Sequence, residues 1–192
     1  MTIAILAVQG AFAEHGAMLD RLGADHFEVR KAADLSRPFD GLILPGGEST
    51  VMSKLLRELG LFAPLKEKLD AGLPVFGTCA GLILLADRVE GGEPCFGGMD
   101  VTARRNAYGR QLGSFRTTAP FAGEPVPMVF IRAPYIVQAG PGAEVLAETG
   151  GHIVAARQGN RLATAFHPEL TGDTRVHACF LEMAAAGSFP AQ

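Results

Sequence analysis

Apolar runs alternate with amphipathic stretches over the first 90 residues of the chain. The apolar runs predict strands buried on both faces, and the amphipathic stretches predict helices. The predicted strands span residues 3–8, 26–31, part of 40–47, and 74–77, and the predicted helices span 13–22, 49–59, 63–71 and 80–86. This alternation favours an α/β fold in which helices cover both faces of a parallel sheet. Such sheets bind ligands at the carboxyl ends of their strands.

The pattern changes after Val89, where Gly and Pro separate a series of short apolar stretches. Further strands are predicted at residues 100–105, 126–133, 144–148, 152–158 and 161–167, and a last helix at 174–185. We expect an antiparallel extension that then returns to the main sheet. Because no internal repeat or linker interrupts the chain, residues 1–192 are predicted to form a single domain.

Composition and charge narrow the classes of function. The 17 basic and 20 acidic residues form no basic stripe, which argues against a nucleic-acid partner. The apolar start of the chain is too short to span a bilayer and lacks the positive region of a signal peptide, so we expect no membrane association. Three cysteines without paired or metal-like spacing predict free thiols, a cytoplasmic protein and no metal site. The sequence carries no nucleotide or cofactor motif, and we expect no cofactor.

A cysteine occupies the corner between a predicted strand and a predicted helix, in the segment GTCAG (77–81). This pattern is typical of a nucleophile on a strained turn that lifts its side chain out of the sheet. Side chains at the two glycine positions would collide with the neighbouring strand and helix. The start of the next helix favours a Cys79 thiolate, and the Ala80 amide is placed to stabilise an oxyanion. Cys95 and Cys179 lack this frame.

A thiol nucleophile needs a base, and the base needs a group that orients it. His167 follows an apolar strand, and Glu169 comes two residues later, across a proline that fixes the turn. Both side chains can therefore face the same side, which makes them the candidate base and its orienting group. The other histidines have no such neighbour: His15, His26, His152 and His177. We expect His177 on the polar face of the last helix.

Two further segments are candidates for substrate contact. In LPGGEST (44–50), two glycines precede a helix that we expect Ser49 or Thr50 to cap, and the exposed amides can supply a second oxyanion donor. The loop lacks the Gly-Lys-Ser/Thr ending of a P-loop. The segment ARRNAYGRQ (103–111) concentrates three arginines, which either bind a carboxylate or remain solvated.

These motifs together resemble a known family. The chain is similar to the glutaminase subunits of pyridoxal 5'-phosphate synthase, within the triad (class I) glutamine amidotransferases. The matching segments occur in order along the chain: LAVQGAFAEH, LILPGGEST, FGTCAGLILLA, RRNAYGRQ, FIRAP and FHPELTGDTRVH. The resemblance implies a class I glutamine amidotransferase-like (flavodoxin-like) three-layer α/β sandwich, with a central, mostly parallel sheet and a small antiparallel extension.

The resemblance also implies roles for individual residues. Cys79 is implied to be the nucleophile, His167 the general base and acid, and Glu169 the residue that orients His167. The Gly47 and Ala80 amides are implied to form the oxyanion hole. The residues implied to surround bound L-glutamine are Gly47, Glu48, Ser49, Arg105, Ile131 and Arg132. The loop at residues 9–15 is implied to respond to docking of the synthase partner.

The implied reaction is hydrolysis of L-glutamine to L-glutamate and ammonia through a glutamyl thioester. One domain that already holds a hydrolytic site has no room for a second site that would consume the ammonia. A partner chain is therefore expected to receive it. By resemblance this partner is the synthase subunit that makes pyridoxal 5'-phosphate (vitamin B6), which is then a product of the complex and not a cofactor of this chain.

Two alternatives remain open from the sequence. The glutaminase of another class I amidotransferase, such as imidazole glycerol phosphate synthase, would share the cysteine and histidine motifs but is not expected to carry RNAYGRQ or FIRAP. A non-catalytic redox or binding module on a similar sheet would not need Glu169 behind His167.

Overall fold

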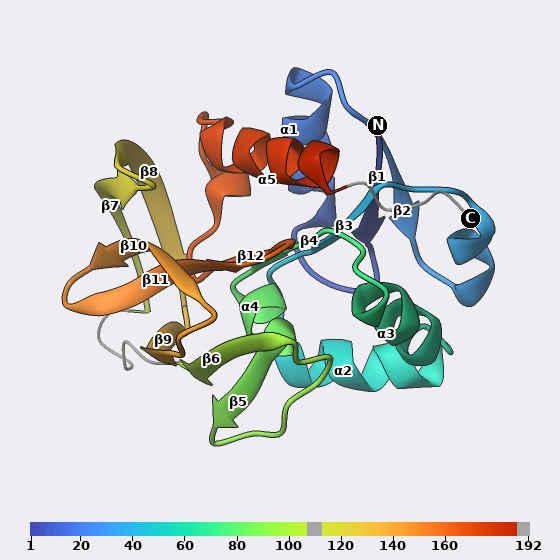
Figure 1. Ribbon diagram of the computed structural model, residues 1–192, viewed down its shortest axis with the longest axis horizontal. Coiled ribbons are helices and arrows are strands. Elements are labelled where there is room, and N and C mark those ends of the chain that lie inside the picture. The colour runs from blue at the N-terminus through green and yellow to red at the C-terminus, as the bar shows by residue number, and fades with distance from the viewer. Residues whose placement is uncertain (107–112, 188–192) are drawn as a thin grey trace.

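The computed structural model of the protein describes residues 1–106 and 113–187. Within these residues, ten strands form one sheet and a separate pair forms a second sheet (Figure 1). The strands of the large sheet are β1 (Thr2–Leu6), β2 (Asp25–Val29), β3 (Gly41–Leu44), β4 (Val75–Thr78), β5 (Ala86–Glu90), β6 (Met99–Arg104), β9 (Tyr135–Ala139), β10 (Glu144–Thr149), β11 (His152–Gln158) and β12 (Arg161–Thr164). The separate pair is β7 (Ser114–Phe121) and β8 (Glu124–Ile131).

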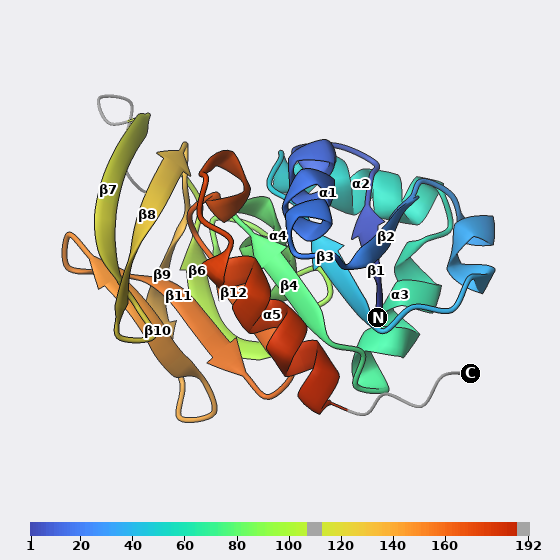
Figure 2. The ribbon, with the colours of Figure 1, turned by 90° about the horizontal axis from the view of Figure 1, so that it is seen from above.

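Helices cover both faces of the large sheet, as the sequence predicts. Figures 1 and 2 show α1 (Phe12–Arg21) and α5 (Arg175–Ala186) on one face, with α2 (Ser49–Glu58), α3 (Phe62–Asp70) and α4 (Ala80–Leu85) on the other. Two short 3-10 turns, η1 (Ala32–Ser36) and η2 (Pro168–Leu170), complete the described elements. Among the described residues, none of the helices has the length and apolar character needed to cross a membrane.

The strand order places three carboxyl ends side by side. The large sheet runs β2-β1-β3-β4-β12-β11-β9-β6-β5, and β10 pairs with β11 outside this path. The strands from β2 to β12 in this order pair in parallel. Leu44 of β3 is level with Gly77 of β4, and Thr164 of β12 is level with Thr78. The loops after β3, β4 and β12 therefore leave the sheet at the same edge.

The second half of the chain confirms the expected antiparallel extension. Strands β9, β10 and β11 pair in antiparallel fashion, and β12 then returns the chain to the parallel part beside β4. The sequence pattern misses β5, β7 and β9. It also assigns Ala86 to a helix, whereas the backbone there is extended and begins β5. The mostly exposed, polar β5 lacks the apolar run by which the buried strands are recognised.

The core forms where the helices pack on the parallel strands. All residues of β3 and β4 are buried, which explains why these strands are apolar except for Thr78 at the end of β4. Phe76 of β4 packs on Phe180 of α5, with ring centroids 5.7 Å apart. Full burial of one such side chain contributes about 1.5–3 kcal/mol. This packing gives the loops at the strand ends a rigid base.

Candidate active site

Cys79 occupies a strained backbone position directly between β4 and α4. Its φ of 49° and ψ of −98° lie in a region that non-glycine residues rarely adopt. The Cys79 amide donates to the Thr164 carbonyl of β12 at 2.8 Å, which fixes the corner to the neighbouring strand. The strained turn predicted from the GTCAG pattern is therefore confirmed.

The two glycines of this corner are required by close backbone packing. A Cβ atom on Gly77 would lie 2.6 Å from the carbonyl group of Gly81, and one on Gly81 would lie 2.1 Å from the Leu44 oxygen of β3. Real Cβ atoms essentially never approach other atoms this closely. The corner accordingly tolerates no larger residue at either position, as the sequence analysis expects.

His167 and Glu169 lie at the end of the adjacent strand and contact each other. Nδ1 of His167 is 2.7 Å from Oε1 of Glu169, whose side chain is fully buried. Burial alone lowers the pKa of His167, but hydrogen bonds and charge from Cys79 and Glu169 act in the opposite direction and raise it to about 10. Because Nδ1 of His167 contacts Glu169, the other ring nitrogen, Nε2, is available to interact with Cys79. The structure thus brings the three predicted residues together in one chain of contacts.

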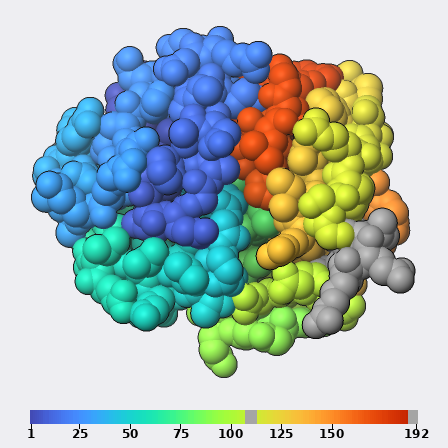
Figure 3. Space-filling model, turned by 180° about the vertical axis from the view of Figure 1, so that it is seen from behind, coloured from blue at the N-terminus to red at the C-terminus, as the bar shows by residue number. Residues whose placement is uncertain are grey.

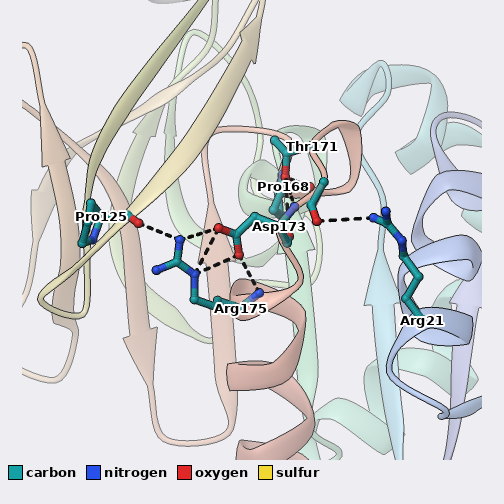
Figure 4. A network of polar contacts seen from close by, with 7 residues as sticks. Arg21, Pro125, Pro168, Thr171, Asp173 and Arg175 are labelled. Atoms are coloured by element: carbon teal, nitrogen blue, oxygen red, sulfur yellow. Dashed lines mark hydrogen bonds and ion pairs between the residues drawn. The ribbon is translucent and has the colours of Figure 1, made fainter.

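A polar network holds the turn that carries these two residues (Figure 4). Arg175 pairs with Asp173 and donates to the Pro125 carbonyl at 2.7 Å, which ties the start of α5 to β8. Arg21 of α1 donates to the Gly172 carbonyl at 3.4 Å. Exposed pairs of this kind add little stability individually. Their contacts to two different elements nevertheless fix the segment after η2 in place.

A cavity of about 650 Å³ opens beside Cys79. Its size lies within the range that small-molecule sites occupy. The segments that line it come from both halves of the chain, which meet on the face shown in Figure 3. Every predicted site residue except Glu169 lines the cavity: Gly47, Glu48, Ser49, Cys79, Ala80, Arg105, Ile131, Arg132 and His167. Glu169 is buried behind His167.

The loop after β3 approaches both Cys79 and His167. A Cβ atom on Gly46 would lie 2.3 Å from Cε1 of His167 and 3.3 Å from Cβ of Cys79. The Gly46 amide donates to Oγ1 of Thr78 at 3.0 Å. Gly46 therefore sets the space between the Cys79 and His167 side chains, a role that was not predicted from the sequence. The sequence signal for this role was the pair of consecutive glycines, but only Gly47 of the pair was named as a candidate site residue.

Glu48, and neither Ser49 nor Thr50, caps helix α2. The Glu48 carboxylate accepts from the Val51 amide at 2.8 Å and the Thr50 amide at 3.2 Å, so the expected Ser49 or Thr50 cap is wrong. Partial burial raises the pKa of Glu48, but these amides and the Arg105 charge outweigh it and lower the pKa. The Glu48 side chain is longer than that of Ser49 or Thr50 and can reach the amides of the first turn. Its negative charge also suits the positive end of the helix dipole.

Arg105 is paired at the cavity wall, where 28% of its side chain stays exposed. It contacts Glu48 and Thr50 at 2.9 Å each. Arg105 lines the cavity beside the Glu48 carboxylate, and its contact with a substrate carboxylate stays a prediction. Residues 107–111 of that cluster lie outside the described residues.

The end of β8 forms the opposite wall. The Ile131 carbonyl lies 4.0 Å from the Cys79 sulfur, and the following Arg132 has a positive φ of 45°. The Arg132 amide donates to the Gly113 carbonyl at 2.5 Å. This local turn directs the Ile131–Arg132 backbone toward Cys79.

Two histidines behind the triad were not recognised from the sequence. His177 does not lie on a polar helix face: it is fully buried and its Nε2 is 2.9 Å from Nδ1 of His15, which is also fully buried. The helical spacing of the buried residues on α5, Val176, His177, Phe180, Met183 and Ala184, was the signal that could have located it.

Within residues 1–106 and 113–187, no group of three or more His, Cys, Asp or Glu side chains could hold a metal ion. The three cysteines are free. The site is therefore described by its own side chains and backbone amides: a strained thiol, a buried imidazole–carboxylate pair, and a polar cavity. This arrangement is able to cleave an acyl bond by nucleophilic attack.

Comparison with known proteins identifies the class to which this fold and site belong. A crystal structure of a glutamine amidotransferase superposes with a TM-score of 0.89 and 44% identity, covering 95% of this chain and 98% of that one. The chain is thus similar in fold to the glutamine amidotransferases.

The particular family follows from the sequence. Residues 5–186 match the SNO glutamine amidotransferase family, and the chain belongs to that family. It is 61% identical to the pyridoxal 5'-phosphate synthase subunit PdxT of Methanocorpusculum labreanum, over 96% of this chain and 98% of that protein. It is 57% identical to the subunit of the same name from Bifidobacterium longum, over 93% and 98%. The expected family resemblance is confirmed.

Proposed function

We propose that this chain is the glutaminase subunit of a pyridoxal 5'-phosphate synthase. It hydrolyses L-glutamine to L-glutamate and ammonia, and it passes the ammonia to the synthase subunit. The observation that carries the proposal is the contact between His167 and Glu169 beside the strained Cys79, in a chain that shares 61% identity with a subunit named for this synthase. A redox or binding module has no use for a buried carboxylate behind the histidine.

The cavity suits an amino-acid zwitterion. Its lining includes the acidic Glu14 and Glu48 and the basic Arg105 and Arg132, so both signs of charge face the space beside Cys79. An α-ammonium group is stabilised by the carboxylates, and an α-carboxylate by the guanidinium groups. We assign Gly47, Glu48, Ser49, Arg105, Ile131 and Arg132 to binding of the glutamine, with its side-chain amide directed to Cys79.

In the first half of the reaction, the Cys79 thiolate attacks the side-chain amide carbon of glutamine. The carbonyl oxygen becomes an oxyanion, which the backbone amides of Gly47 and Ala80 stabilise by hydrogen bonds. The raised pKa of His167 means that the ring carries a proton at neutral pH. His167 gives this proton to the leaving nitrogen, so the carbon–nitrogen bond breaks, ammonia departs and a glutamyl thioester remains.

In the second half, the neutral His167 removes a proton from a water molecule as this water attacks the thioester. The carbon–sulfur bond breaks, glutamate leaves and the thiolate–imidazolium pair is restored. Glu169 holds the Nδ1–H of His167 throughout, which fixes the ring and stabilises its charged form. The three free thiols suit a reducing compartment, and we place the reaction in the cytoplasm.

The test is glutamate release from L-glutamine by the purified chain, measured with and without the purified synthase subunit from the same source. We expect release that rises with the synthase subunit and vanishes in the matched Cys79→Ala variant. A rate of glutamate release that is the same with and without the synthase subunit would point to another ammonia acceptor and would overturn the vitamin B6 assignment. Absence of glutamate release in both conditions would overturn the glutaminase assignment.

A further inference from the structure

A cluster of buried polar side chains lies directly behind the triad and has no role in the reaction described above. His15 of α1, Thr78 of β4 and His177 of α5 are each fully buried, and none of the three lines the cavity. Burial of polar groups is costly unless they are hydrogen-bonded. The hydrogen-bond partners of these three residues therefore indicate what the cluster holds in place.

The contacts of His15 lead to the triad carboxylate. Its Nε2 lies 3.6 Å from Oε2 of Glu169 and 3.2 Å from Oγ1 of Thr78. Its Nδ1 lies 2.9 Å from Nε2 of His177. The two oxygens of the Glu169 carboxylate differ. Oε1 contacts His167, whereas Oε2 has no hydrogen-bond partner within the described part of the chain. Nε2 of His15 is therefore the ring nitrogen that faces the second carboxylate oxygen, just beyond hydrogen-bond distance.

Both buried histidines are neutral at physiological pH. Burial, together with the nearby His177 and His167, lowers the pKa of His15 well below its ordinary value. Burial lowers the pKa of His177 to about 4. A neutral imidazole has one N–H, and the Thr78 hydroxyl can either donate to Nε2 of His15 or accept from it. Because the neighbouring Glu169 carboxylate only accepts, we assign the proton of His15 to Nε2. Its Nδ1 then accepts the Nε2–H of His177.

The same nitrogen also connects to the loop after β3. Oγ1 of Thr78 receives the Gly46 amide at 3.0 Å and faces Nε2 of His15 at 3.2 Å. The Gly46 loop carries Gly47, one of the two proposed oxyanion donors. One imidazole ring is therefore adjacent to the support of both the base and the oxyanion loop.

We propose that His15 is a positioning residue for glutamine hydrolysis, whose Nε2–H attracts Oε2 of the Glu169 carboxylate across 3.6 Å and so keeps Oε1 on His167. This inference rests on the proposed function. A neutral donor is suited to the task because it restrains the carboxylate without neutralising the negative charge that stabilises protonated His167. A cation in the same place would compete with His167 for that charge.

Two substitutions of similar size separate positioning from packing. Glutamine at residue 15 places an amide N–H close to the position of the imidazole Nε2, whereas asparagine reaches only the position of Nδ1 and the bond to His177. We expect H15N to lower kcat by roughly 10- to 100-fold, the usual effect of losing a supporting hydrogen bond behind a reacting group, with KM little changed. H15Q should retain most of the wild-type kcat. H26N serves as the control for loss of a histidine from the partly exposed surface.

A second readout does not require glutaminase activity or the synthase subunit. The rate at which iodoacetamide alkylates Cys79, followed by mass spectrometry of its peptide, reports on the thiolate–imidazolium pair. We expect slower alkylation in H15N and a rate close to wild type in H15Q. Equal losses in both variants, with a matching drop in melting temperature, would show that His15 only packs and would overturn the proposal. Wild-type kcat and alkylation in H15N would overturn it as well. If the wild-type chain releases no glutamate, the proposed function fails, and the alkylation comparison still decides the role of His15.

Discussion

Replacing Gly46 by alanine would insert a methyl group between the two side chains assigned to proton transfer. The added Cβ atom would lie 2.3 Å from Cε1 of His167, 2.9 Å from its Nδ1 and 3.3 Å from Cβ of Cys79. Carbon atoms in ordinary contact lie about 3.5–4.0 Å apart. Relief of the clash therefore requires a movement of at least about 1 Å at the ring or the loop. The ring cannot move this far and keep its 2.7 Å contact with Glu169.

The magnitude follows from this displacement. Misplacing a reacting group by about 1 Å costs on the order of 100-fold in rate. Forcing an extra methyl group into a packed site typically costs about 1–3 kcal/mol of stability. We therefore expect G46A to remain folded but to lose about 99% of the glutamate release measured with the synthase subunit present.

Gly172 supplies the matched control, because a Cβ atom there meets nothing within 4 Å. G172A should keep both its melting temperature and its glutamate release. If G46A hydrolyses glutamine at the wild-type rate, the assigned spacing of Cys79 and His167 around Gly46 is wrong. A G46A chain that unfolds at assay temperature would be examined by Cys79 alkylation at lower temperature, where slow alkylation supports the displacement and a wild-type rate contradicts it.

Three further predictions concern the triad and its buried surroundings. C79A should abolish glutamate release yet still bind the synthase subunit in a pull-down, since the backbone of the corner depends on its glycines; loss of binding would instead give Cys79 a part in assembly. E169Q removes the charge that raises the pKa of His167, so kcat should fall by roughly 10²- to 10⁴-fold and Cys79 alkylation at neutral pH should slow; an unchanged kcat would remove Glu169 from the mechanism. The pKa of His177 is lowered to about 4 from an ordinary value of 6.5, so the unfolded chain binds more protons as the pH falls below 6.5. The contribution of neutral His177 to the free energy of unfolding is therefore fully present above pH 6.5 and falls by up to about 3 kcal/mol as the pH drops to about 4. Denaturant titrations of H177F should show an unfolding free energy that depends less on pH than that of the wild-type chain.

The parallel part of the sheet was predictable because burial on both faces leaves an unmistakable sequence pattern. The strands β1, β3 and β4 are short apolar runs that end in glycine-rich loops, and these ends are where the site forms. The Cys79 corner was also predictable from the sequence. Its G-x-C-x-G pattern places the cysteine between two glycines, and the close packing of β3 and α4 leaves no room for a side chain at either glycine. Local sequence was sufficient wherever local geometry determined the outcome.

Several features that depend on contacts between distant segments were not predicted, although the approach of Cys79 to His167 was. His15 and His177 are 162 positions apart, and nothing in the neighbours of either residue indicates a bonded pair. Glu48 was expected to contact substrate, and its use as a helix cap depends on the backbone angle at which the chain leaves the loop after β3. The spacing role of Gly46 depends on a histidine that follows 121 positions later, so it required the folded arrangement of β3, β4 and β12.

The segment at residues 9–15 connects the two parts of the site that catalysis must coordinate. At its start, Oε1 of Gln9 accepts the Glu48 amide at 2.8 Å, and a Cβ atom on Gly10 would lie 1.8 Å from the Gly46 oxygen. At its end, inside α1, His15 reaches the Glu169 carboxylate. Any movement of this short segment must therefore disturb both the loop that carries Gly46 and Gly47 and the surroundings of Glu169. Under the proposed function, a partner that docks against residues 9–15 would act on the Gly46–Gly47 loop and on the Glu169 carboxylate at the same time.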